Sequence, residues 1–438
     1  MMREPGLSLV EKRVLVLGLG DTGVSVARWV EREGGRVRAA DTRAAPPGMA
    51  RFAGELHTGA FTSGLLAGVD LVCISPGLSL AQPLVREARD KGIPVVGDVE
   101  LFAWKNRSPV LAITGTNGKT TVTALTGHLL RATGVDCEVA GNIAPPVLDA
   151  ALRRATPPAA WALELSSYQL ETTESLRPAA AAMLNLSEDH LDRYASLDEY
   201  GAAKARIFIG AALQILNRDD ARSVAMAIPG RRAVTFGLDA PPREEDLGVV
   251  DGKLVRGRET IVPLAELGIH GAHNVANALA ACALVSALGA RISPQALKDF
   301  KGLPHRLQVV ATRRGVDWYD DSKGTNVGAT VAALRGLGRR AVLILGGDGK
   351  GQDFAPLKDA VARHAAKVLL IGRDAPIIER VTGGERCASL EEAVEKAAAI
   401  ARPGEAVLLS PACASFDMFR DYRHRGEAFA RAVRGLPA

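Results

Sequence analysis

Cysteine is scarce in this sequence, and its cysteines lie far apart. Only five occur among 438 residues, and no two of them form a Cys-x-x-Cys pair. This pattern argues against a disulfide framework and against a cysteine-rich zinc site. Reduced thiols fit a reducing compartment, so we expect a cytoplasmic protein.

Aromatic residues and runs of like charge are also rare. Phe, Trp and Tyr make up 4% of the chain, and no run of five or more Lys or Arg occurs. These absences argue against a base-stacking surface or a basic arm, so we expect no nucleic-acid partner. The net charge of +5 is mild over this length and suits phosphorylated small molecules as ligands.

The sequence lacks a hydrophobic run long enough to cross a bilayer. The longest apolar stretch, residues 278–290, is interrupted by Ser286 and is shorter than the roughly 20 residues that a spanning helix needs. The first thirteen residues lack the apolar core of a signal peptide. We therefore expect neither secretion nor membrane insertion.

Short apolar runs alternate with amphipathic segments along the whole chain, which predicts an α/β fold with mostly parallel sheets. Hydrophobic residues make up 47% of the chain, and its length suggests about three domains. Buried strands are expected at residues 14–17, 71–74, 110–113, 161–165, 182–186, 342–345, 368–371 and 407–409. Helices are expected at 24–33, 120–132, 197–207 and 390–401, the last with Ser389 and Glu392 as a capping box.

Two joints predict the domain boundaries. Gly97-Asp98 follows a strand and precedes a new strand–loop–helix unit, and Gly302-Leu303-Pro304 follows a helix and precedes new strands. We therefore expect domains at residues 1–97, 98–302 and 303–438. The irregular stretch 241–263, with a hairpin expected at Asp251-Gly252, is interpreted as an excursion within the middle domain.

A glycine fingerprint follows the first expected strand. Gly18-Leu19-Gly20-Asp21-Thr22-Gly23 fits G-x-G-x-x-G and opens a helix, and Asp41 ends the next strand. The glycines would let a diphosphate approach the N–H groups at the helix N-terminus. Arg43 could add a contact to phosphate or to uracil. The alternative is a tight strand–helix turn without a ligand, and the fingerprint does not say which nucleotide binds.

A phosphate-binding loop is the strongest local signal. Thr114-Gly115-Thr116-Asn117-Gly118-Lys119-Thr120-Thr121 joins the strand 110–113 to a helix. In such a loop backbone N–H groups cradle phosphates, a lysine reaches the transferable phosphate, and a following hydroxyl binds Mg²⁺. The loop is a shortened variant, because Ile113 stands where the strict pattern has its first glycine.

Two side chains at expected strand ends are candidate metal ligands. Glu164 ends the strand 161–165, and His190 follows the strand 182–186. Strands that end on the same side of a parallel sheet place both side chains over one crevice. A carboxylate with an imidazole accepts Mg²⁺ or Mn²⁺, and the alternative is a surface acid with a capping histidine.

Two other segments leave their roles open. Lys204 lies on a helix of small residues, and its residues alone favour a solvated lysine. Asn274 and Asn277 share a helix face, which suits amide contacts to a base or a phosphate. Helix capping explains Asn274 almost as well.

The last third of the chain has four polar segments that follow expected strands. They are His305-Arg306 and residues 320–326, 345–354 and 410–417. Loops at the carboxyl ends of strands are where α/β sheets bind ligands. Four such segments in one domain make a purely structural interpretation weak.

Together these motifs resemble the Mur ligases, ATP-dependent amide-forming enzymes of peptidoglycan precursor assembly. The resemblance rests on the phosphate loop, on Glu164-Leu165-Ser166-Ser167-Tyr168-Gln169-Leu170, on Asp189-His190, on residues 273–277 and on His305-Arg306. It implies a Rossmann-like N-terminal domain, a central P-loop ATPase-like domain with a mostly parallel sheet, and a Rossmann-like C-terminal domain. Residues 321–326, 346–354 and 410–415 resemble the member that adds D-glutamate to UDP-N-acetylmuramoyl-L-alanine.

The resemblance also implies a role for each candidate residue. UDP-sugar binding is implied for Thr22, Asp41, Thr42, Arg43, Gly77 and Asn142. ATP binding is implied for Gly115, Thr116, Asn117, Gly118, Lys119, Thr120, Thr121, Asn274, Asn277, Arg306 and Asp321. Binding of D-glutamate is implied for Lys323, Thr325, Lys350, Ser415 and Tyr422. Mg²⁺, with Mn²⁺ as a substitute, would be held by Thr120, Glu164, His190 and a carbamylated Lys204, and the catalytic residues would be Lys119, Glu164, His190 and Lys204.

Other classes of protein remain as alternatives. A sister ligase for another amino acid, or a folylpolyglutamate synthetase, would share the middle domain, but residues 41–43 and the Lys350 region argue against both. A nicotinamide dehydrogenase would use Gly18–Gly23 and leave Lys119 unexplained. A non-catalytic nucleotide-binding regulator would not need Lys119, Glu164 and His190 together. We expect a monomeric enzyme.

Overall fold

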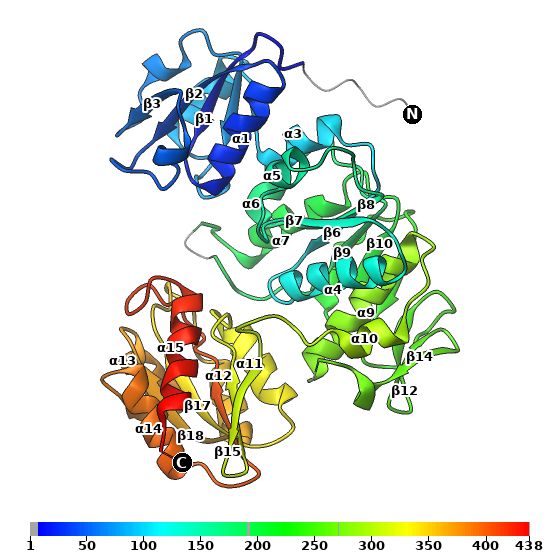
Figure 1. Cartoon of the computed structure of the whole chain (residues 1–438), viewed down its shortest axis with the longest axis vertical. Coiled ribbons are helices and arrows are strands. Elements are labelled where there is room, and N and C mark those ends of the chain that lie inside the picture. The colour runs from blue at the N-terminus through cyan, green and yellow to red at the C-terminus, as the bar shows by residue number, and fades with distance from the viewer. Residues whose placement is uncertain (1–7, 191–192, 270, 438) are drawn as a thin grey trace.

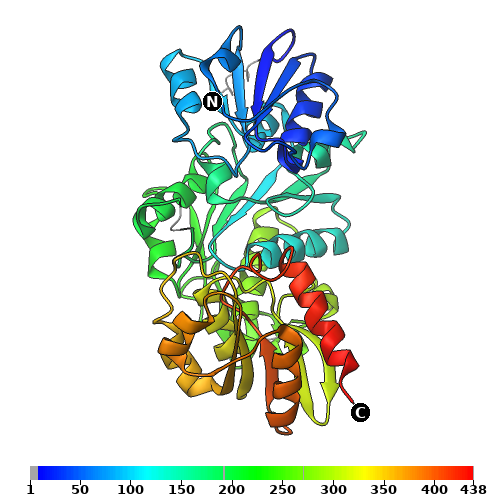
Figure 2. The same ribbon diagram turned by 90° about the vertical axis from the view of Figure 1, so that its left-hand side faces the viewer.

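The computed structural model describes residues 8–190, 193–269 and 271–437. Three α/β units follow one another along the long axis of the molecule, with the N-terminal unit at one end and the C-terminal unit at the other (Figure 1). The view from the side shows the same order, with the central unit between the other two (Figure 2). The predicted α/β fold with three sheets is confirmed.

The N-terminal sheet has five parallel strands in the order β3-β2-β1-β4-β5. The strands are β1 (Arg13–Leu17), β2 (Arg36–Asp41), β3 (Glu55–Thr58), β4 (Leu71–Ile74) and β5 (Val95–Val96). Helices α1 (Asp21–Arg32) and α2 (Pro83–Asp90) connect them, with single 3₁₀ turns at Met49–Arg51 and Ser63–Leu66. Because β1 lies at the centre, the glycine turn that follows it opens at the middle of the carboxyl edge of the sheet.

The central sheet has nine strands in the order β14-β13-β12-β11-β10-β9-β6-β8-β7. They are β6 (Val110–Thr114), β7 (Cys137–Gly141), β8 (Ala160–Glu164), β9 (Ala180–Met183), β10 (Gln214–Asn217), β11 (Ala233–Phe236), β12 (Leu247–Val250), β13 (Lys253–Arg256) and β14 (Glu259–Pro263). The antiparallel pairings are β12 with β13 and β13 with β14, and these strands extend the same sheet. The predicted excursion with a hairpin at Asp251-Gly252 is therefore confirmed.

The helices of the central unit cover its sheet. They are α3 (Asp98–Lys105), α4 (Lys119–Ala132), α5 (Val147–Leu152), α6 (Ser167–Leu170), α7 (Leu197–Ala205), α8 (Ala221–Ala225), α9 (Ala272–Ala287) and α10 (Pro294–Asp299), with 3₁₀ turns at Arg206–Phe208 and Leu264–Glu266. Helix α9 contains most of the longest apolar stretch, and its residues 278–285 are buried. No helix in the described parts of the chain combines the length and the apolar character needed to cross a membrane.

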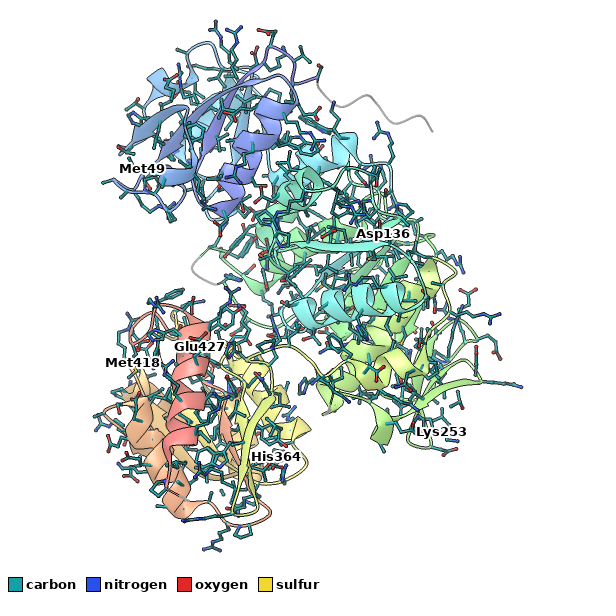
Figure 3. The ribbon with its side chains drawn as sticks, viewed as in Figure 1. Met49, Asp136, Lys253, His364, Met418 and Glu427 are labelled. Atoms are coloured by element: carbon teal, nitrogen blue, oxygen red, sulfur yellow. The ribbon has the colours of Figure 1, made fainter. Side chains whose placement is uncertain are left out.

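The C-terminal sheet has six strands in the order β15-β16-β20-β17-β18-β19, of which only β15 is antiparallel. They are β15 (Gln308–Arg313), β16 (Val316–Asp320), β17 (Ala341–Gly346), β18 (Ala365–Ile371), β19 (Glu385–Arg386) and β20 (Ala406–Leu409). The helices are α11 (Val327–Gly336), α12 (Leu357–His364), α13 (Ala375–Thr382), α14 (Leu390–Ile400) and α15 (Tyr422–Gly435). Figure 3 shows side chains filling each unit, while charged residues such as Lys253 and Glu427 lie on the outside.

Three sequence predictions differ from the structure in detail. The strand predicted at 182–186 is β9, which ends at Met183, because Asn185 instead bonds the phosphate loop. The helix predicted at 197–207 ends at Ala205 and continues as a 3₁₀ turn. Ser389 caps α14 as predicted, but the Glu392 carboxylate accepts from the Ala388 N–H, so the capping box closes one residue early.

Two of the three units share an apolar core, and the third has its own. One cluster joins the N-terminal unit to the central unit, with Val16 and Trp29 in the same core as Leu148 and Trp161. The two clusters of the C-terminal unit contain only residues from Leu307 onward. Burial of apolar area contributes about 25 cal/mol per Å². The first interface is therefore held by a shared core, whereas the C-terminal unit has a separate core.

Candidate active site

The predicted phosphate loop joins β6 to α4 at the centre of the middle sheet. The side chain of Asn185 holds it in place, because the Asn117 N–H donates to Asn185 Oδ1 over 2.8 Å and the Asn185 side-chain amide donates back to the Asn117 carbonyl over 3.1 Å. Gly118 has φ +85°, and a Cβ there would lie 2.4 Å from Asn277 Oδ1. The loop therefore requires glycine at this position, and it presents the N-terminus of the 14-residue helix α4.

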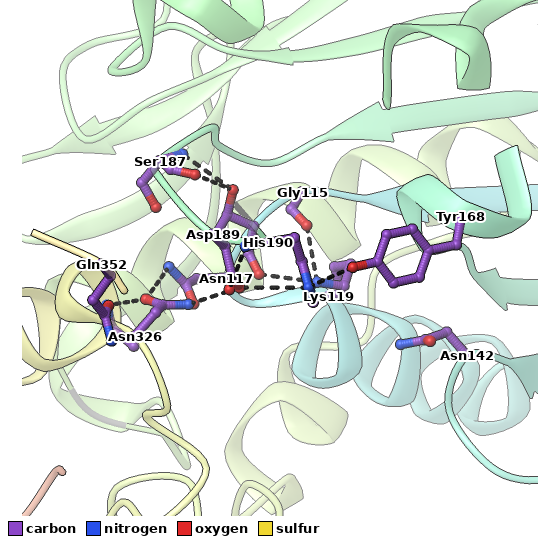
Figure 4. A network of polar contacts seen from close by, with 12 residues as sticks. Gly115, Asn117, Lys119, Asn142, Tyr168, Ser187, Asp189, His190, Asn326 and Gln352 are labelled. Carbon is purple, nitrogen blue, oxygen red and sulfur yellow. Dashed lines mark hydrogen bonds and ion pairs between the residues drawn. The ribbon is translucent and has the colours of Figure 1, made fainter. Parts of the chain in front are cut away.

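Lys119 lies at the first residue of α4 and bends back over the loop. Its Nζ donates to the carbonyls of Gly115 and Thr116, each over 2.9 Å (Figure 4). Burial lowers the pKa of Lys119, and the charge of Arg306 adds to this effect against the opposing attraction of Glu164 and Asp189. The ammonium group is therefore held beside the cradle by weak carbonyl partners that a phosphate can replace.

Glu164 lies at the end of β8 with its side chain almost fully buried. The Asn142 amide donates to Glu164 Oε1 over 2.7 Å, whereas Oε2 has no hydrogen-bond partner within the described chain. An unpartnered buried carboxylate oxygen is costly, and a hard cation is the partner that suits it. The donor set therefore fits the predicted magnesium ligand.

One ring nitrogen of His190 contacts a tyrosine hydroxyl, and the other, Nε2, lies 3.8 Å from Asp189 Oδ2. The Tyr168 hydroxyl lies 2.7 Å from His190 Nδ1, and the two rings meet edge to face (Figure 4). Burial lowers the pKa of His190, and nearby Lys350, Lys119 and Lys204 lower it further against the opposing effect of Asp189. The neutral imidazole that results can present Nε2 as a ligand. The backbone at His190 has φ +56°, an uncommon conformation for a residue with a side chain.

No group of three or more His, Cys, Asp or Glu side chains spaced for a metal occurs in the described ranges. The predicted magnesium site has only Glu164 and His190 from these residue types, and its other ligands would be the Thr120 hydroxyl, a carbamylated Lys204, phosphate oxygens and water. In the structure Thr120 Oγ1 instead accepts from the Arg306 guanidinium over 2.5 Å. Arg306 thus lies at the cradle itself.

We expect Tyr168→Phe to raise the KM for Mg²⁺ about tenfold while changing kcat less. The hydroxyl fixes the orientation of His190, and removal of such a supporting group typically weakens metal binding 10- to 100-fold. The measurement is a Mg²⁺ titration of activity. Tyr194→Phe is the matched control, because that hydroxyl donates to Glu171, while the ring packs against Tyr168 and Tyr200. An unchanged Mg²⁺ titration for Tyr168→Phe would contradict the positioning role.

Lys204 is buried, contrary to the solvated lysine that its residues alone favour. Its side chain is 1% exposed, and Nζ donates to the Gly115 carbonyl over 2.8 Å and lies 4.7 Å from the centre of the Tyr200 ring. Burial lowers its pKa well below the usual range, and the charge of Lys119 adds to this. Both effects favour the neutral form of the amine, which touches the same carbonyl as Lys119 does.

The C-terminal unit reaches the phosphate loop through a polar network. Asn117 and Asn326 exchange two amide hydrogen bonds of 3.3 and 3.1 Å, and Asn326 also donates to Asp189 over 3.2 Å (Figure 4). Gln352 accepts from the Val327 N–H in the same group. These contacts between polar groups join residues 209 positions apart in the sequence.

Seven of the eleven residues predicted to bind ATP surround one small cavity of about 90 Å³. It is lined by Asn117, Gly118, Thr121, Asn274, Asn277, Arg306 and Asp321. Burial raises the pKa of Asp321 to about 7, partly offset by the hydrogen bond from Ser410. Typical ligand pockets measure roughly 300–1,000 Å³, so we expect the C-terminal unit to move relative to the loop when a nucleotide binds.

The six residues predicted to bind the UDP-sugar all line a cleft of about 490 Å³ between the N-terminal and central units. They are Thr22, Asp41, Thr42, Arg43, Gly77 and Asn142. Gly23 is required at the turn, because a Cβ there would lie 2.0 Å from the Gly18 carbonyl oxygen. Asp21 also lines the cleft, and its exposed carboxylate pairs with Arg51.

Asp41 organises this cleft through its carboxylate. It accepts from the Leu19 N–H over 2.8 Å and from Nε and Nη2 of Arg43 over 2.8 and 2.6 Å. The hydrogen bonds from Arg43 lower the pKa of Asp41 to about 2, against the opposing effect of burial. The buried anion therefore ties the glycine turn to the start of the next loop.

We expect Asp41→Asn to speed amide hydrogen exchange in residues 14–24 about 5- to 30-fold at pH 7, the equivalent of a local loss of 1–2 kcal/mol. Stability from a carboxyl with a lowered pKa is present above its unfolded value of 3.8 and is lost as pH falls towards 2. The difference should therefore be the same at pH 5 as at pH 7. Asp21→Asn, on the exposed side of the turn, should leave the exchange unchanged.

The residues predicted to bind the amino-acid substrate lie on three loops of the C-terminal unit. Lys323 Nζ lies 4.2 Å from the centre of the Tyr422 ring, and burial lowers the pKa of Lys323 to about 8. Lys350 is exposed with φ +53°, yet its charge reaches both His190 and Lys323. Ser415 is buried and Thr325 is half-buried. Lys323 also lines the nucleotide cavity, so the two predicted subsites meet there.

Sequence reasoning did not single out two residues that the site uses. Tyr168 was visible only as part of a motif, although it lies on α6 only four residues after Glu164. Asn185 follows β9 directly, and a polar residue after a buried strand is the signal that would have found it.

A phosphate loop with a buried carboxylate beside it and a cleft on either side fits the class of ATP-dependent ligases. The chain matches the Mur ligase MurD-like N-terminal domain over residues 12–97, the Mur ligase middle domain over 113–285 and the Mur ligase glutamate ligase domain over 305–413. The chain belongs to the Mur ligase family, whose members are ATP-dependent.

Individual relatives agree with this assignment. The chain is 53% identical to the UDP-N-acetylmuramoylalanine–D-glutamate ligase of Thiobacillus denitrificans, over 100% of this chain and 99% of the relative. It is also 53% identical to the enzyme of that name from Nitrosospira multiformis, over 99% and 97%. The MurF ligase of Thermotoga maritima, solved with ADP, has the same fold, with a TM-score of 0.61 and 15% identity over 98% of this chain and 99% of that one.

Proposed function

We propose that this chain joins D-glutamate to UDP-N-acetylmuramoyl-L-alanine at the expense of ATP, in cytoplasmic peptidoglycan precursor synthesis. The full-length 53% identity to ligases of that name supports it. The geometric support is Asn142, which lines the UDP-sugar cleft and donates to Glu164 beside the phosphate loop. One side chain thus links the cleft for the acceptor to the site of phosphoryl transfer.

The domains at residues 1–97, 98–302 and 303–438 would divide the work. The first would hold the UDP-sugar through the turn at Thr22 and through Arg43, and the second would hold ATP on the loop at Lys119. The third would bring Lys350 and the amino acid to the same point. Both clefts are formed within one chain, which supports a monomer, and five free buried cysteines suit the cytoplasm.

The reaction would proceed in two displacements. The terminal carboxylate of the alanyl group attacks the γ-phosphate of ATP, which gives an acyl phosphate and releases ADP. The amine of D-glutamate then attacks the acyl carbon, and the tetrahedral intermediate expels phosphate to leave the amide. Activation is needed because an ionised carboxylate has no good leaving group.

The side chains of the chain would act mainly by placing charge. Lys119 would leave the carbonyls of Gly115 and Thr116 and follow the transferred phosphoryl group. Helix α4 adds only about 0.3–1 kcal/mol per exposed charge through its dipole, so the lysine carries more. Glu164, His190 and Thr120 would hold Mg²⁺, which neutralises phosphate charge when bound.

The test is phosphate release with ATP, Mg²⁺ and UDP-N-acetylmuramoyl-L-alanine across a panel of amino acids. We expect release with D-glutamate and none with L-glutamate, L-lysine or meso-diaminopimelate. Release with another amino acid would leave a sister ligase and would overturn the Lys350 and Ser415 assignments. No release with any amine would overturn the ligase proposal, and polyglutamylation of a folate would move it to the synthetase alternative.

A further inference from the structure

Arg193 connects the loop after β4 to the neighbourhood of the predicted magnesium ligand His190. One guanidinium nitrogen, Nη1, donates to the Pro76 carbonyl over 2.9 Å, across 117 positions of the sequence. The other, Nη2, donates to Glu171 Oε2 over 2.6 Å. The guanidinium also lies over the ring of Tyr168, with 4.1 Å between Cζ and the ring centre. A single side chain thus contacts the N-terminal unit, Glu171 and Tyr168 at once.

The loop that contains Pro76 is part of the UDP-sugar cleft. Ser75, Pro76 and Gly77 all line that cleft, and Gly77 is among the residues predicted to bind the UDP-sugar. The Ser75 hydroxyl donates to the Gly18 carbonyl over 2.8 Å, which ties this loop to the glycine turn after β1. A group that fixes the Pro76 carbonyl therefore helps to fix one wall of the cleft.

The other end of the connection is the predicted metal ligand. The Tyr168 hydroxyl lies 2.7 Å from His190 Nδ1, so the ring that Arg193 covers also contacts the imidazole (Figure 4). The backbone adds a second contact, because the Arg193 N–H donates to the His190 carbonyl over 3.0 Å. A cation over an aromatic ring contributes about 0.5–1 kcal/mol at exposed sites and about 2 kcal/mol when desolvated. Two side chains, Arg193 and Tyr168, therefore join the cleft loop to the predicted magnesium site.

The contacts of Arg193 are sheltered from solvent. Its side chain is 12% exposed and that of Glu171 is 17% exposed. Salt screens a partly buried ion pair less than a surface pair, and removing one member leaves the other charge without its partner. A guanidinium can donate in two directions while it lies flat on an aromatic ring, which the single ammonium group of lysine does not reproduce. The residue types at these positions therefore fit a rigid link.

We propose that Arg193 is a positioning residue that couples the UDP-sugar cleft to the magnesium site. A UDP-sugar in the cleft would hold the Pro76 carbonyl and with it Arg193. Tyr168 would then keep His190 in the orientation that binds the cation. Coupling between two ligands is reciprocal, so each would bind more tightly when the other is present. The inference rests on the proposed function, because it takes a UDP-sugar as the ligand of the cleft.

The test measures the binding of UDP-N-acetylmuramoyl-L-alanine to the full chain by calorimetry. A non-hydrolysable ATP analogue is present throughout, so that no turnover occurs, and each titration is made once with EDTA and once with saturating Mg²⁺. For the wild-type protein we expect Mg²⁺ to lower the Kd of the UDP-sugar about tenfold, within the range usual for coupled sites. For Arg193→Ala we expect a ratio of about two or less. A direct contact between the sugar and the cation would persist in this variant, so the loss measures what Arg193 contributes.

Further variants separate positioning from a general structural loss. Arg206→Ala is the matched control, because Arg206 is also half-buried in the central unit but donates to the carbonyls of Leu170 and Thr173. This variant should keep the wild-type ratio. Arg193→Lys keeps the charge without the double donation and should behave as Arg193→Ala does. Tyr168→Phe should reduce the ratio in the same way, and the double variant of Arg193→Ala with Tyr168→Phe should reduce it no further, because the two side chains act in series.

Three outcomes would overturn this inference alone. One is a wild-type ratio in either Arg193 variant, which would make the contacts of Arg193 purely structural. Another is a further loss in the double variant, which would show that Arg193 and Tyr168 act separately. The third is wild-type binding of the UDP-sugar that Mg²⁺ does not change. The absence of any UDP-sugar binding to the wild-type protein would overturn the proposed function as well, so the two failures are distinguishable.

Discussion

Lys119→Ala is expected to lower kcat at least 10³-fold, equivalent to about 4 kcal/mol of transition-state stabilisation. Charge that develops on the transferred phosphoryl group needs preorganised cations, and removing one typically costs 10²- to 10⁵-fold. Lys119 is suited to this role because its present partners are only the carbonyls of Gly115 and Thr116. The measurement is ADP release with saturating substrates.

The folded state should tolerate this substitution. Alanine removes two hydrogen bonds but also removes a buried ammonium group whose pKa is lowered by desolvation, so the two effects offset each other. We expect the thermal midpoint to change by a few degrees at most. Lys358→Ala, an exposed lysine on α12, should keep full activity. A Lys119→Ala enzyme with kcat within tenfold of the wild type would contradict the role.

Lys204→Ala is expected to lose about 100-fold in activity, and added bicarbonate should not restore it. We propose that the neutral amine adds CO₂ to form a carbamate, with an N–C bond made and one proton released to solvent. The structure favours this because Lys204 is buried beside the cation Lys119, and both effects lower its pKa. The resulting anion would support the predicted magnesium site. Loss of a group that supports a metal site typically lowers metal affinity or activity 10- to 100-fold.

Two further measurements separate the carbamate from a purely structural lysine. Lys204→Arg keeps a cation that can donate to the Gly115 carbonyl but does not form the carbamate, so it should be as inactive as the alanine variant. Wild-type protein under ¹³CO₂ should show a carbamate carbon resonance that Lys204→Ala lacks. Lys253→Ala, on the distant hairpin, is the control and should be fully active. Full activity in Lys204→Arg would contradict the carbamate.

Local sequence patterns were sufficient to predict the secondary-structure elements and the glycine-rich loops between them. The apolar run at residues 110–113 followed by a glycine-rich segment and a lysine predicted β6, the phosphate loop and α4 at nearly their observed bounds. The glycine fingerprint after β1 and the position of Asp41 at the end of β2 were predicted equally well. Strand periodicity, glycine turns and helix caps depend on residues a few positions apart, which is why a single sequence reveals them.

Lys204 shows the limit of such reasoning. The small residues of α7 and its charged side chains favour a solvated lysine, because nothing within the helix predicts burial. It is buried because Tyr200 and the phosphate loop, about 90 positions earlier in the chain, close over it. Only the resemblance to a family suggested a role for it from the sequence.

The sequence by itself determined the three α/β sheets, the phosphate loop and which polar residues follow the strand ends. Tertiary structure alone decided which of these groups meet: Asn142 with Glu164, Tyr168 with His190, and Asn117 with Asn326. The physical reason is that such contacts depend on which strands become neighbours and how the units pack. That order is set by the burial of whole sheet faces, to which no local pattern corresponds.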